Sequence, residues 1–161
     1  MILTAKKGSN RFNRNGWPIP ILPTFRKVLS YSFKIDSTWF EGDLTEPLQY
    51  GVKLPAIGKF NYHNSGANFA IAWVKGKLLL YPRLYTGKND LKRWQSKGIE
   101  LKPNIWYDCE IYNFRNGIVF EYGDKMFISD YDIKGHWISP AWIGSRNKAV
   151  AIKDLKLEIK Y

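Results

Sequence analysis

Apolar and polar residues alternate in short runs along most of this chain. The clearest run covers residues 28–36, and its apolar positions are Leu29, Tyr31, Phe33 and Ile35. A period of two places successive side chains on opposite faces of a β-strand. Shorter runs of the same kind follow, and no segment has the period of an amphipathic helix. The pattern therefore predicts about ten short strands and an all-β chain.

Glycine-containing turns separate the runs. Asn116-Gly117 lies between two apolar runs and is the strongest short hairpin signal in the sequence. Residues 74–77, with Gly76, predict a second hairpin between residues 69–75 and 77–85. Such turns recur roughly every ten residues, which is typical of a sandwich or a barrel.

Residues 1–27 differ from the rest of the chain. They are basic, and they contain a segment, 17–23, in which three prolines force extended backbone. Trp17, Ile19 and Leu22 are too apolar to be left in water, so they are expected to pack on the body of the protein or on a partner. We therefore expect an N-terminal arm at 1–27 and a single β-sandwich domain at 28–161.

The second strand of the 69–85 hairpin carries the first candidate for chemistry. Its alternate positions Lys77, Tyr81, Arg83 and Tyr85 fall on one face. Phenols can stack on a sugar and hydrogen-bond to it, and a guanidinium can bind a carboxylate with two hydrogen bonds. The face is expected to bind an acidic sugar; the structural alternative is the amphipathic outer face of an edge strand.

Two neighbouring segments are expected near this face. His63 lies in the loop just before the hairpin, although a solvated loop histidine is the simpler interpretation. Residues 86–97 predict a long basic loop, with at most one helical turn, that contains Trp94. Trp94 would serve either as a sugar-stacking platform or as a core residue.

The formal net charge of +11, from 25 basic and 14 acidic residues, favours polyanionic partners. Many lysines are scattered along the predicted strands, where they also protect sheet edges. Aromatic residues interleave with basic ones, as in proteins that bind single-stranded nucleic acid. No motif of a nucleic-acid-binding fold is present, so an acidic polysaccharide or glycan is the preferred partner.

Other features bound the protein's chemistry. Cys109, the only cysteine, lies in an alternating run and is expected to be a buried, unreactive thiol. The two histidines are far apart and lack cysteine neighbours, so no zinc site and no other cofactor is expected. No run is apolar enough to insert into a membrane. The start of the chain has no signal-peptide pattern, which leaves the compartment open: cytoplasmic, virion-associated, or exported with the signal already removed.

The closing segment resembles a known fold. Residues 140–145 form a glycine-containing loop, and residues 149–159 read as a last strand with alternating apolar positions. Both are similar to the final strands of the concanavalin A-like superfamily. The resemblance implies an antiparallel jelly-roll sandwich of two sheets, and it says nothing about activity.

The middle of the chain is similar, more faintly, to the alginate-lyase-like polysaccharide lyases. Lys53-Leu54-Pro55-Ala56 matches their Lys-Leu-Pro-Gly segment except for alanine, and Trp73 with the turn at Gly76 also matches. Residues 69–72 lack the serine and arginine of Phe-Ser-x-Arg, and the Tyr-x-Tyr element is only half kept. The resemblance implies charge neutralisation by Lys53 and acid–base chemistry by Tyr81 or Tyr85, with Arg83 as a replacement for the missing arginine.

An acidic pattern competes with this interpretation. Glu41, Asp43 and Glu46 fit E-x-D-x-x-E, which resembles the catalytic pattern of laminarinase-type glycoside hydrolases. Gly42 and Pro47 depart from that pattern. An acidic surface loop is the simpler interpretation, and a structural calcium site is a further alternative.

Taken together, the sequence predicts a jelly-roll domain that recognises an anionic, uronate-containing polysaccharide through Lys53, His63, Lys77, Tyr81, Arg83, Tyr85 and Trp94. If the protein is an enzyme, a polysaccharide lyase is preferred over a glycoside hydrolase. The remaining alternative is a viral or phage structural or glycan-attachment protein that contacts an assembly partner through its basic arm.

Overall fold

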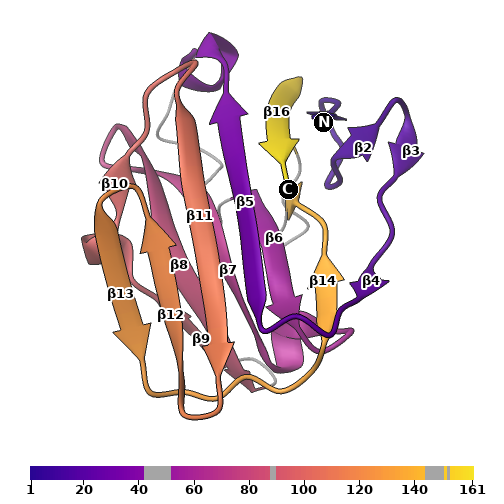
Figure 1. Cartoon of the computed structure of the whole chain (residues 1–161). Coiled ribbons are helices and arrows are strands. Elements are labelled where there is room, and N and C mark those ends of the chain that lie inside the picture. The colour runs from indigo at the N-terminus through magenta and orange to yellow at the C-terminus, as the bar shows by residue number, and fades with distance from the viewer. Residues whose placement is uncertain (42–51, 88–89, 144–150, 152) are drawn as a thin grey trace.

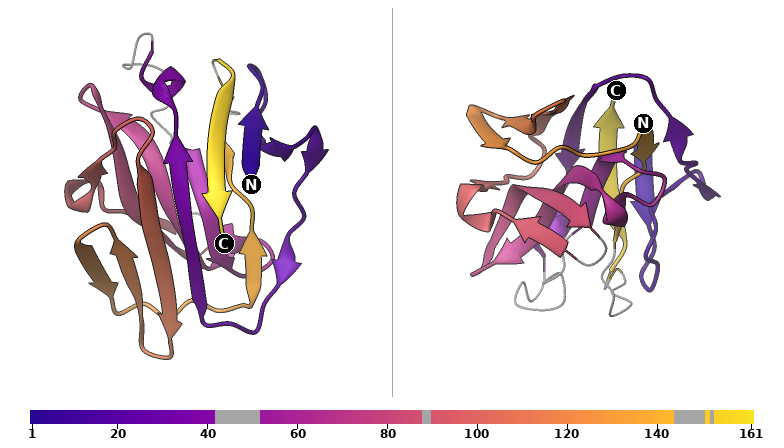
Figure 2. Two further views of the ribbon diagram at one scale, coloured as in Figure 1. Left: turned by 45° about the horizontal axis from the view of Figure 1, so that its top comes forward. Right: turned by 90° about the horizontal axis from the view of Figure 1, so that it is seen from below.

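The computed structural model describes residues 1–41, 52–87, 90–143, 151 and 153–161. Two antiparallel sheets, each of eight strands, stack face to face as two layers (Figure 1). The view from below separates the layers and shows the first and last strands side by side (Figure 2). Within the described residues the only helical segments are short 3-10 turns, η1 (Ser37–Phe40), η3 (Tyr62–Asn64) and η4 (Gln95–Lys97).

Sheet A has the strand order β13-β12-β11-β5-β16-β1-β2-β3. Its strands are β1 (Ile2–Ala5), β2 (Asn13–Arg14), β3 (Trp17–Pro18), β5 (Val28–Ile35), β11 (Trp106–Phe114), β12 (Gly117–Tyr122), β13 (Lys125–Ser129) and β16 (Leu155–Lys160). The first and last strands of the chain are neighbours, because Leu3 pairs with Leu157 and Ala5 with Leu155.

Sheet B has the main order β10-β8-β7-β6-β14-β4, with β9 also paired to β8 and β15 to β6. Its strands are β4 (Leu22–Pro23), β6 (Val52–Gly58), β7 (Gly66–Val74), β8 (Lys77–Gly87), β9 (Asp90–Arg93), β10 (Ile99–Glu100), β14 (Trp137–Ser139) and β15 (Trp142–Ile143).

The core lies between the two layers. Strand β5 buries the four apolar side chains that its alternation predicts, and the polar positions face outward. Across the gap, the ring of Phe69 on β7 lies 5.4 Å from that of Phe120 and 5.1 Å from that of Tyr122, both on β12. Burial of these large rings helps to hold the two sheets together. Cys109 is also fully buried there, and burial raises the pKa of its thiol, so the expectation of a buried cysteine is confirmed.

Both predicted hairpins are confirmed. β11 and β12 pair from Phe114–Gly117 onward. β7 and β8 pair from Val74–Lys77 along their whole length, with Lys75 and Gly76 at φ values of 51° and 76°. Positive φ at both central residues is the geometry whose twist matches that of a two-residue hairpin.

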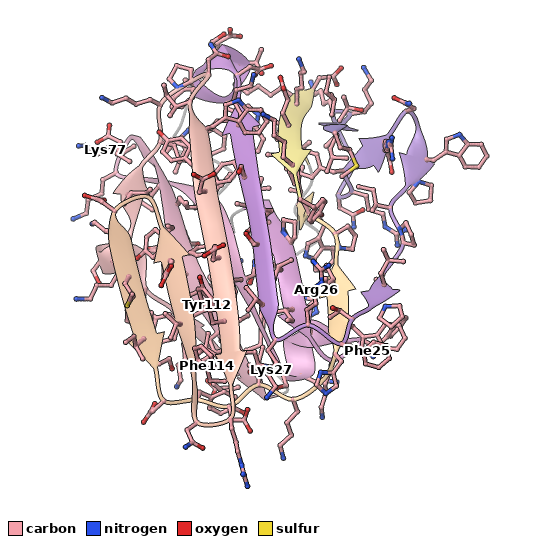
Figure 3. All side chains as sticks on the ribbon, viewed as in Figure 1. Phe25, Arg26, Lys27, Lys77, Tyr112 and Phe114 are labelled. Atoms are coloured by element: carbon pink, nitrogen blue, oxygen red, sulfur yellow. The ribbon has the colours of Figure 1, made fainter. Side chains whose placement is uncertain are left out.

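Residues 1–27 take part in both sheets. They supply β1, β2 and β3 to sheet A and β4 to sheet B, and Leu3, Ala5 and Phe12 lie in the core. Other apolar side chains of this segment are exposed, among them Trp17 at 76% and Phe25 at 99%. Figure 3 shows Phe25 projecting outward beside Arg26 and Lys27.

Residues 86–97 were expected to form a loop, and here the structure differs. The strand β9 forms within them and pairs with β8 through Arg83–Arg93 and Tyr85–Leu91, after which η4 supplies the single helical turn. The long strand β8 offers unpaired backbone groups along the edge that faces away from β7. The polar segment that forms β9 has little strand pattern of its own, and it pairs with this edge.

The architecture is an all-β, antiparallel jelly-roll sandwich of the concanavalin A-like type, as the sequence predicts.

Candidate functional site

The candidate site lies on the outer face of sheet B. Along β8 the side chains of Leu78, Leu80 and Leu84 belong to the main core. The intervening Tyr81 and Tyr85 do not; each packs in a small separate cluster on the other face of the strand. Arg83 lies between them, so the alternation predicted from the sequence places all three on one face.

Lys53 reaches this face from the neighbouring part of the sheet. It lies on β6 directly opposite Ala70 of β7, which in turn lies opposite Tyr81 of β8. The register of β6 then shifts between Lys53 and Ala56, at a bulge that contains Pro55, whose missing N–H suits an interrupted ladder. The bulge lets Leu54 and Ile57 both enter the core while Lys53 and Ala56 face outward.

Aromatic rings surround the Lys53 amine. Its Nζ lies 3.0 Å from Nε2 of His63, 4.3 Å from the ring centre of Trp142 and 5.8 Å from that of Tyr85. Nδ1 of His63 lies 3.2 Å from Oδ1 of Asn61. Lysine over an aromatic face is a favourable cation–π arrangement, and it leaves the apolar stem of the lysine buried.

Tyr62 completes the aromatic wall of the site. Its ring stacks on His63 at 4.4 Å and meets Tyr85 edge-on at 5.4 Å, and its hydroxyl accepts a hydrogen bond from Nε1 of Trp142. Burial, and then the nearby Tyr85, raise the pKa of Tyr62, so its hydroxyl stays protonated at neutral pH. Tyr62 can sit this close to the sheet because its Cβ and carbonyl oxygen lie against Gly66, which has no side chain.

Arg83 is the most unusual side chain of the site. It is only 2% exposed, and its Nη2 donates a hydrogen bond of 3.0 Å to the hydroxyl of Tyr85. Its Nε and Nη1 are buried, and among the described residues they have no hydrogen-bond partner. Asn68, opposite Arg83 on β7, is also fully buried and keeps an unpartnered Oδ1 while its Nδ2 bonds to the carbonyl of Phe69. Buried polar groups usually have partners, so these call for an explanation.

The site is strongly electropositive. Burial, then the charges of Arg83 and Arg93, lower the pKa of Lys53 from 10.5 to about 7. Among the described residues, no carboxylate forms an ion pair with Lys53, Arg83 or Arg93. Uncompensated positive charge in a partly desolvated site attracts an anion.

The structure thus brings together five of the predicted binding residues: Lys53, His63, Tyr81, Arg83 and Tyr85. Lys77 lies on the same strand but at its turn end, where it pairs with Glu100 at 2.7 Å, at the margin of the molecule (Figure 3). Trp94 packs on the main core, with its ring 4.5 Å from that of Phe127. Both residues therefore make contacts outside the Lys53–Arg83 site. That they bind ligand stays a prediction.

The acidic pattern is only partly visible. Glu41 is exposed directly after η1, and its backbone carbonyl accepts a hydrogen bond from Lys153. Asp43 and Glu46 lie outside the described residues. Across the residues that are described, no three His, Cys, Asp or Glu side chains gather closely enough to hold a metal ion. Within the described residues, no helix is long and apolar enough to span a membrane.

Four residues of the site were not singled out from the sequence: Tyr62, Asn68, Arg93 and Trp142. Asn68 was detectable, because in the run 66–74 it is the polar member of an alternating set that continues with Ala70 and Ala72. Arg93 sits beside Trp94 in the segment interpreted as a loop. Trp142 comes from a distant part of the chain, and only the pairing of β15 with β6 places it next to Lys53.

Neither a family model nor a curated protein sequence matches the chain. Among solved structures, a bifunctional GH43-CE protein from Bacteroides eggerthii aligns with 99% of this chain at a TM-score of 0.53 and 14% identity. The chain spans 21% of the length of that protein. Domains LG4-5 of the mouse laminin alpha1 chain align with 97% of this chain and 41% of their own, with a TM-score of 0.42 and 9% identity. At such low identity the first similarity supports the fold alone.

Proposed function

We propose that the protein binds an anionic, uronate-containing polysaccharide on the outer face of sheet B. The observation that carries the proposal is Arg83, a buried guanidinium with two nitrogen atoms that lack a partner within the part of the chain that the structure describes. A charged group held in this way destabilises the folded protein unless an anion compensates it. A planar carboxylate is the anion that fits best, because it can accept two parallel hydrogen bonds from one guanidinium.

The groups around Arg83 suit a sugar rather than a bare anion. Trp142 is partly exposed and offers a ring surface on which a pyranose can pack, and the buried rings of Tyr62 and Tyr85 lie behind it. The unpartnered Oδ1 of Asn68 can accept a hydrogen bond from a sugar hydroxyl. Lys53 supplies a second cation within the same site. The proposal rests on this arrangement and not on the similarity to the GH43-CE protein.

The first test is binding. Isothermal titration with oligogalacturonate, oligoalginate and a neutral oligosaccharide of matched length should show binding of a uronate oligomer only. Arg83→Gln should weaken that binding by at least about tenfold, because one charge-assisted pair is lost. Tyr85→Phe, which removes one hydroxyl and keeps the ring, guards against misfolding and should weaken binding less. Equal binding of the neutral oligosaccharide, or unchanged affinity in both variants, would overturn the proposal.

The contacts of Lys53 and Tyr85 favour a second candidate function, polysaccharide lyase activity. Lys53 has a pKa of about 7, so at neutral pH its amine is neutral in a large fraction of molecules and can accept a proton. The hydroxyl of Tyr85 accepts a hydrogen bond from Nη2 of Arg83, so a cation lies beside this candidate acid–base group. β-Elimination needs a base for the C5 proton, a cation at the carboxylate and an acid for the leaving oxygen, and Tyr81, Tyr85 and Lys53 are the candidates for base and acid.

Ultraviolet absorbance separates the two functions. A lyase leaves an unsaturated uronate that absorbs, whereas a binding protein leaves the absorbance unchanged. We expect any rise to disappear in Tyr85→Phe and to persist in Lys125→Ala, since Lys125 lies on β13 of sheet A, in the other layer. Reducing ends that appear without the chromophore would instead indicate a glycoside hydrolase.

A further inference from the structure

The outer face of sheet B continues beyond Lys53 toward the N-terminal segment. Trp142 on β15 lies directly opposite Lys53, and Arg11 forms an antiparallel bridge with Trp142 on its other side. The backbone N–H of Ile143 donates a hydrogen bond of 2.9 Å to the carbonyl of Asn10, which fixes this register. On the other side of Lys53, the pairing continues to Ala70 on β7 and to Tyr81 on β8. These pairs form one row across the strands: Arg11, Trp142, Lys53, Ala70 and Tyr81.

Residues directly opposite one another in antiparallel strands point to the same face. Arg11 therefore shares the face of Lys53 and Tyr81. Its neighbour Phe12 confirms the direction, because Phe12 is buried in the core and stacks on Trp39 at 6.3 Å between ring centres. Arg11 is exposed, and among the described residues it has no ion-pair partner.

A pocket of about 470 Å³ lies at this end of the row. Its lining includes Arg11 and Ile19 from the N-terminal segment, Phe60, Tyr62 and His63 from the region of η3, and Trp142. Tyr62, His63 and Trp142 also belong to the site around Lys53, so the pocket and that site share one aromatic wall. A ligand bound at Lys53 can continue into the pocket past Trp142.

We infer that this pocket is a second subsite for the same anionic polysaccharide, in which Arg11 binds the carboxylate of another uronate residue. The inference rests on the proposed function. Adjacent strands are about 4.8 Å apart, so Arg11 lies roughly 10 Å from Lys53 and roughly 19 Å from Tyr81 across the sheet. A single sugar ring is too short to contact both ends. The ligand therefore runs across the strands, and the protein recognises an oligosaccharide rather than one terminal sugar.

The test measures how the effect of each arginine substitution depends on the length of the ligand. Titrations of the wild type, Arg11→Ala and Arg14→Ala would use a galacturonate or alginate disaccharide and the corresponding hexasaccharide. Arg14→Ala is the matched control. It removes the same charge from the same segment, but Arg14 does not line this pocket. We expect Arg11→Ala to weaken hexasaccharide binding about 5- to 20-fold, as for one lost charge-assisted contact, and to leave disaccharide binding unchanged. Arg14→Ala should bind both ligands as the wild type does.

The outcomes separate this inference from the proposed function. Loss of hexasaccharide affinity that is equal in Arg11→Ala and Arg14→Ala would show a general charge effect and overturn the inference while the proposed function stands. Unchanged hexasaccharide affinity in Arg11→Ala would also overturn it. If the wild type binds no uronate oligomer, both fail together. An intermediate affinity for Arg11→Lys would support contact with two guanidinium nitrogens, which an ammonium group does not reproduce.

Discussion

Lys53 carries its charge at a cost in the folded protein. In the unfolded chain its pKa has the ordinary value of 10.5, and in the folded protein burial and two arginines lower the pKa to about 7. Below pH 7 the amine is charged in both states, and the full cost of charging it destabilises the fold. Between pH 7 and 10.5 the folded state binds fewer protons than the unfolded state, so this contribution to stability improves as the pH rises.

Replacement of the charge should therefore stabilise the protein in a pH-dependent way. Lys53→Met keeps the apolar stem, and we expect it to raise the free energy of unfolding at pH 6 by up to about 5 kcal/mol. The gain should shrink steadily toward pH 10. Urea denaturation of both proteins at several pH values measures it. Lys59→Met, at an exposed position just beyond the same strand, is the control, and a gain of equal size there or one independent of pH would contradict the explanation.

The same residue couples binding to protons. An anion beside Lys53 favours its charged form and raises its pKa. Binding of a uronate oligomer between about pH 7 and pH 10 should therefore take up a fraction of a proton. Titration calorimetry in two buffers of different ionisation enthalpy measures this uptake, and Lys53→Met should reduce it. Identical heats in both buffers would show that Lys53 does not change its protonation on binding.

At the scale of the elements, β7 makes room for the site. Its outer face carries Gly66, Asn68, Ala70 and Ala72, so large rings from neighbouring elements can lie over it. A methyl group at Gly66 would sit 2.7 Å from Cβ of Tyr62 and 2.8 Å from its carbonyl oxygen, both closer than contact allows. The place of η3 above the sheet thus depends on a residue without a side chain.

Gly66→Ala should displace Tyr62 and His63 and destabilise the fold by about 1–3 kcal/mol, as overpacking does. It should also weaken uronate binding. Gly87→Ala is the matched control: Gly87 ends β8, two residues beyond Tyr85, the partner of Gly66, and no atom lies within 4 Å of its added methyl group in the described structure. Thermal unfolding and near-ultraviolet circular dichroism of the tyrosines would report both effects. Equal behaviour of the two variants would argue against this account of η3.

The turn at Lys75-Gly76 offers a stabilising change. Lys75 adopts a φ of 51°, which costs a residue with a Cβ about 1 kcal/mol and suits asparagine better. Lys75→Asn creates the preferred Asn-Gly pair, which already occurs with positive φ at Asn15 and Gly16. We expect a gain of about 0.5–1 kcal/mol, measured by thermal unfolding. A lower melting temperature would mean that Lys75 makes a contact that outweighs its backbone strain.

Pattern alone was sufficient for strands whose two faces differ strongly. β5 and the β11–β12 hairpin are examples, because one face meets the core and the other meets water. β9 and β14 were missed, since each exists only because a long neighbouring strand offers it backbone partners. Such pairing leaves little trace in a short polar or mixed sequence.

The same distinction holds for the site. Tyr81, Arg83 and Tyr85 lie on one strand, so a period of two was enough to group them. Lys53 was identified by a resemblance, and its proximity to Arg83 could not be derived from spacing. Trp142 and Arg11 join the row through pairings between segments that are distant in the sequence. Local pattern carries no information about such partners.

At the scale of the whole molecule, the question is whether residues 1–27 belong to the folded domain. The sequence predicted an arm on a domain of residues 28–161. Leu3 and Ala5 are buried, β1 covers β16, and Phe12 stacks on Trp39. We propose that the segment is part of the folding unit, since its removal would expose an edge of sheet A and open the core.

A chain of residues 28–161 should accordingly unfold at a lower urea concentration than the full chain, by several kcal/mol in the free energy of unfolding. Denaturation of both proteins, followed by tryptophan fluorescence, tests this. Leu3→Ala in the full chain is the milder companion variant and should cost about 2–5 kcal/mol. The same midpoint for the truncated and full chains would establish residues 28–161 as an independent domain.

The pairing of β1 with β16 also sets a limit on when the fold can be completed. Ribosomes make a chain from its N-terminal end, so Ile2–Ala5 is made well before Leu155–Lys160. Until β16 has been made, both β1 and β5 lack the neighbour that lies between them in sheet A. Two nascent strands with an unsatisfied edge therefore wait until Leu155–Lys160 has been made. Contacts of such long sequence separation form slowly, and during this interval the unfinished chain depends on protection from aggregation.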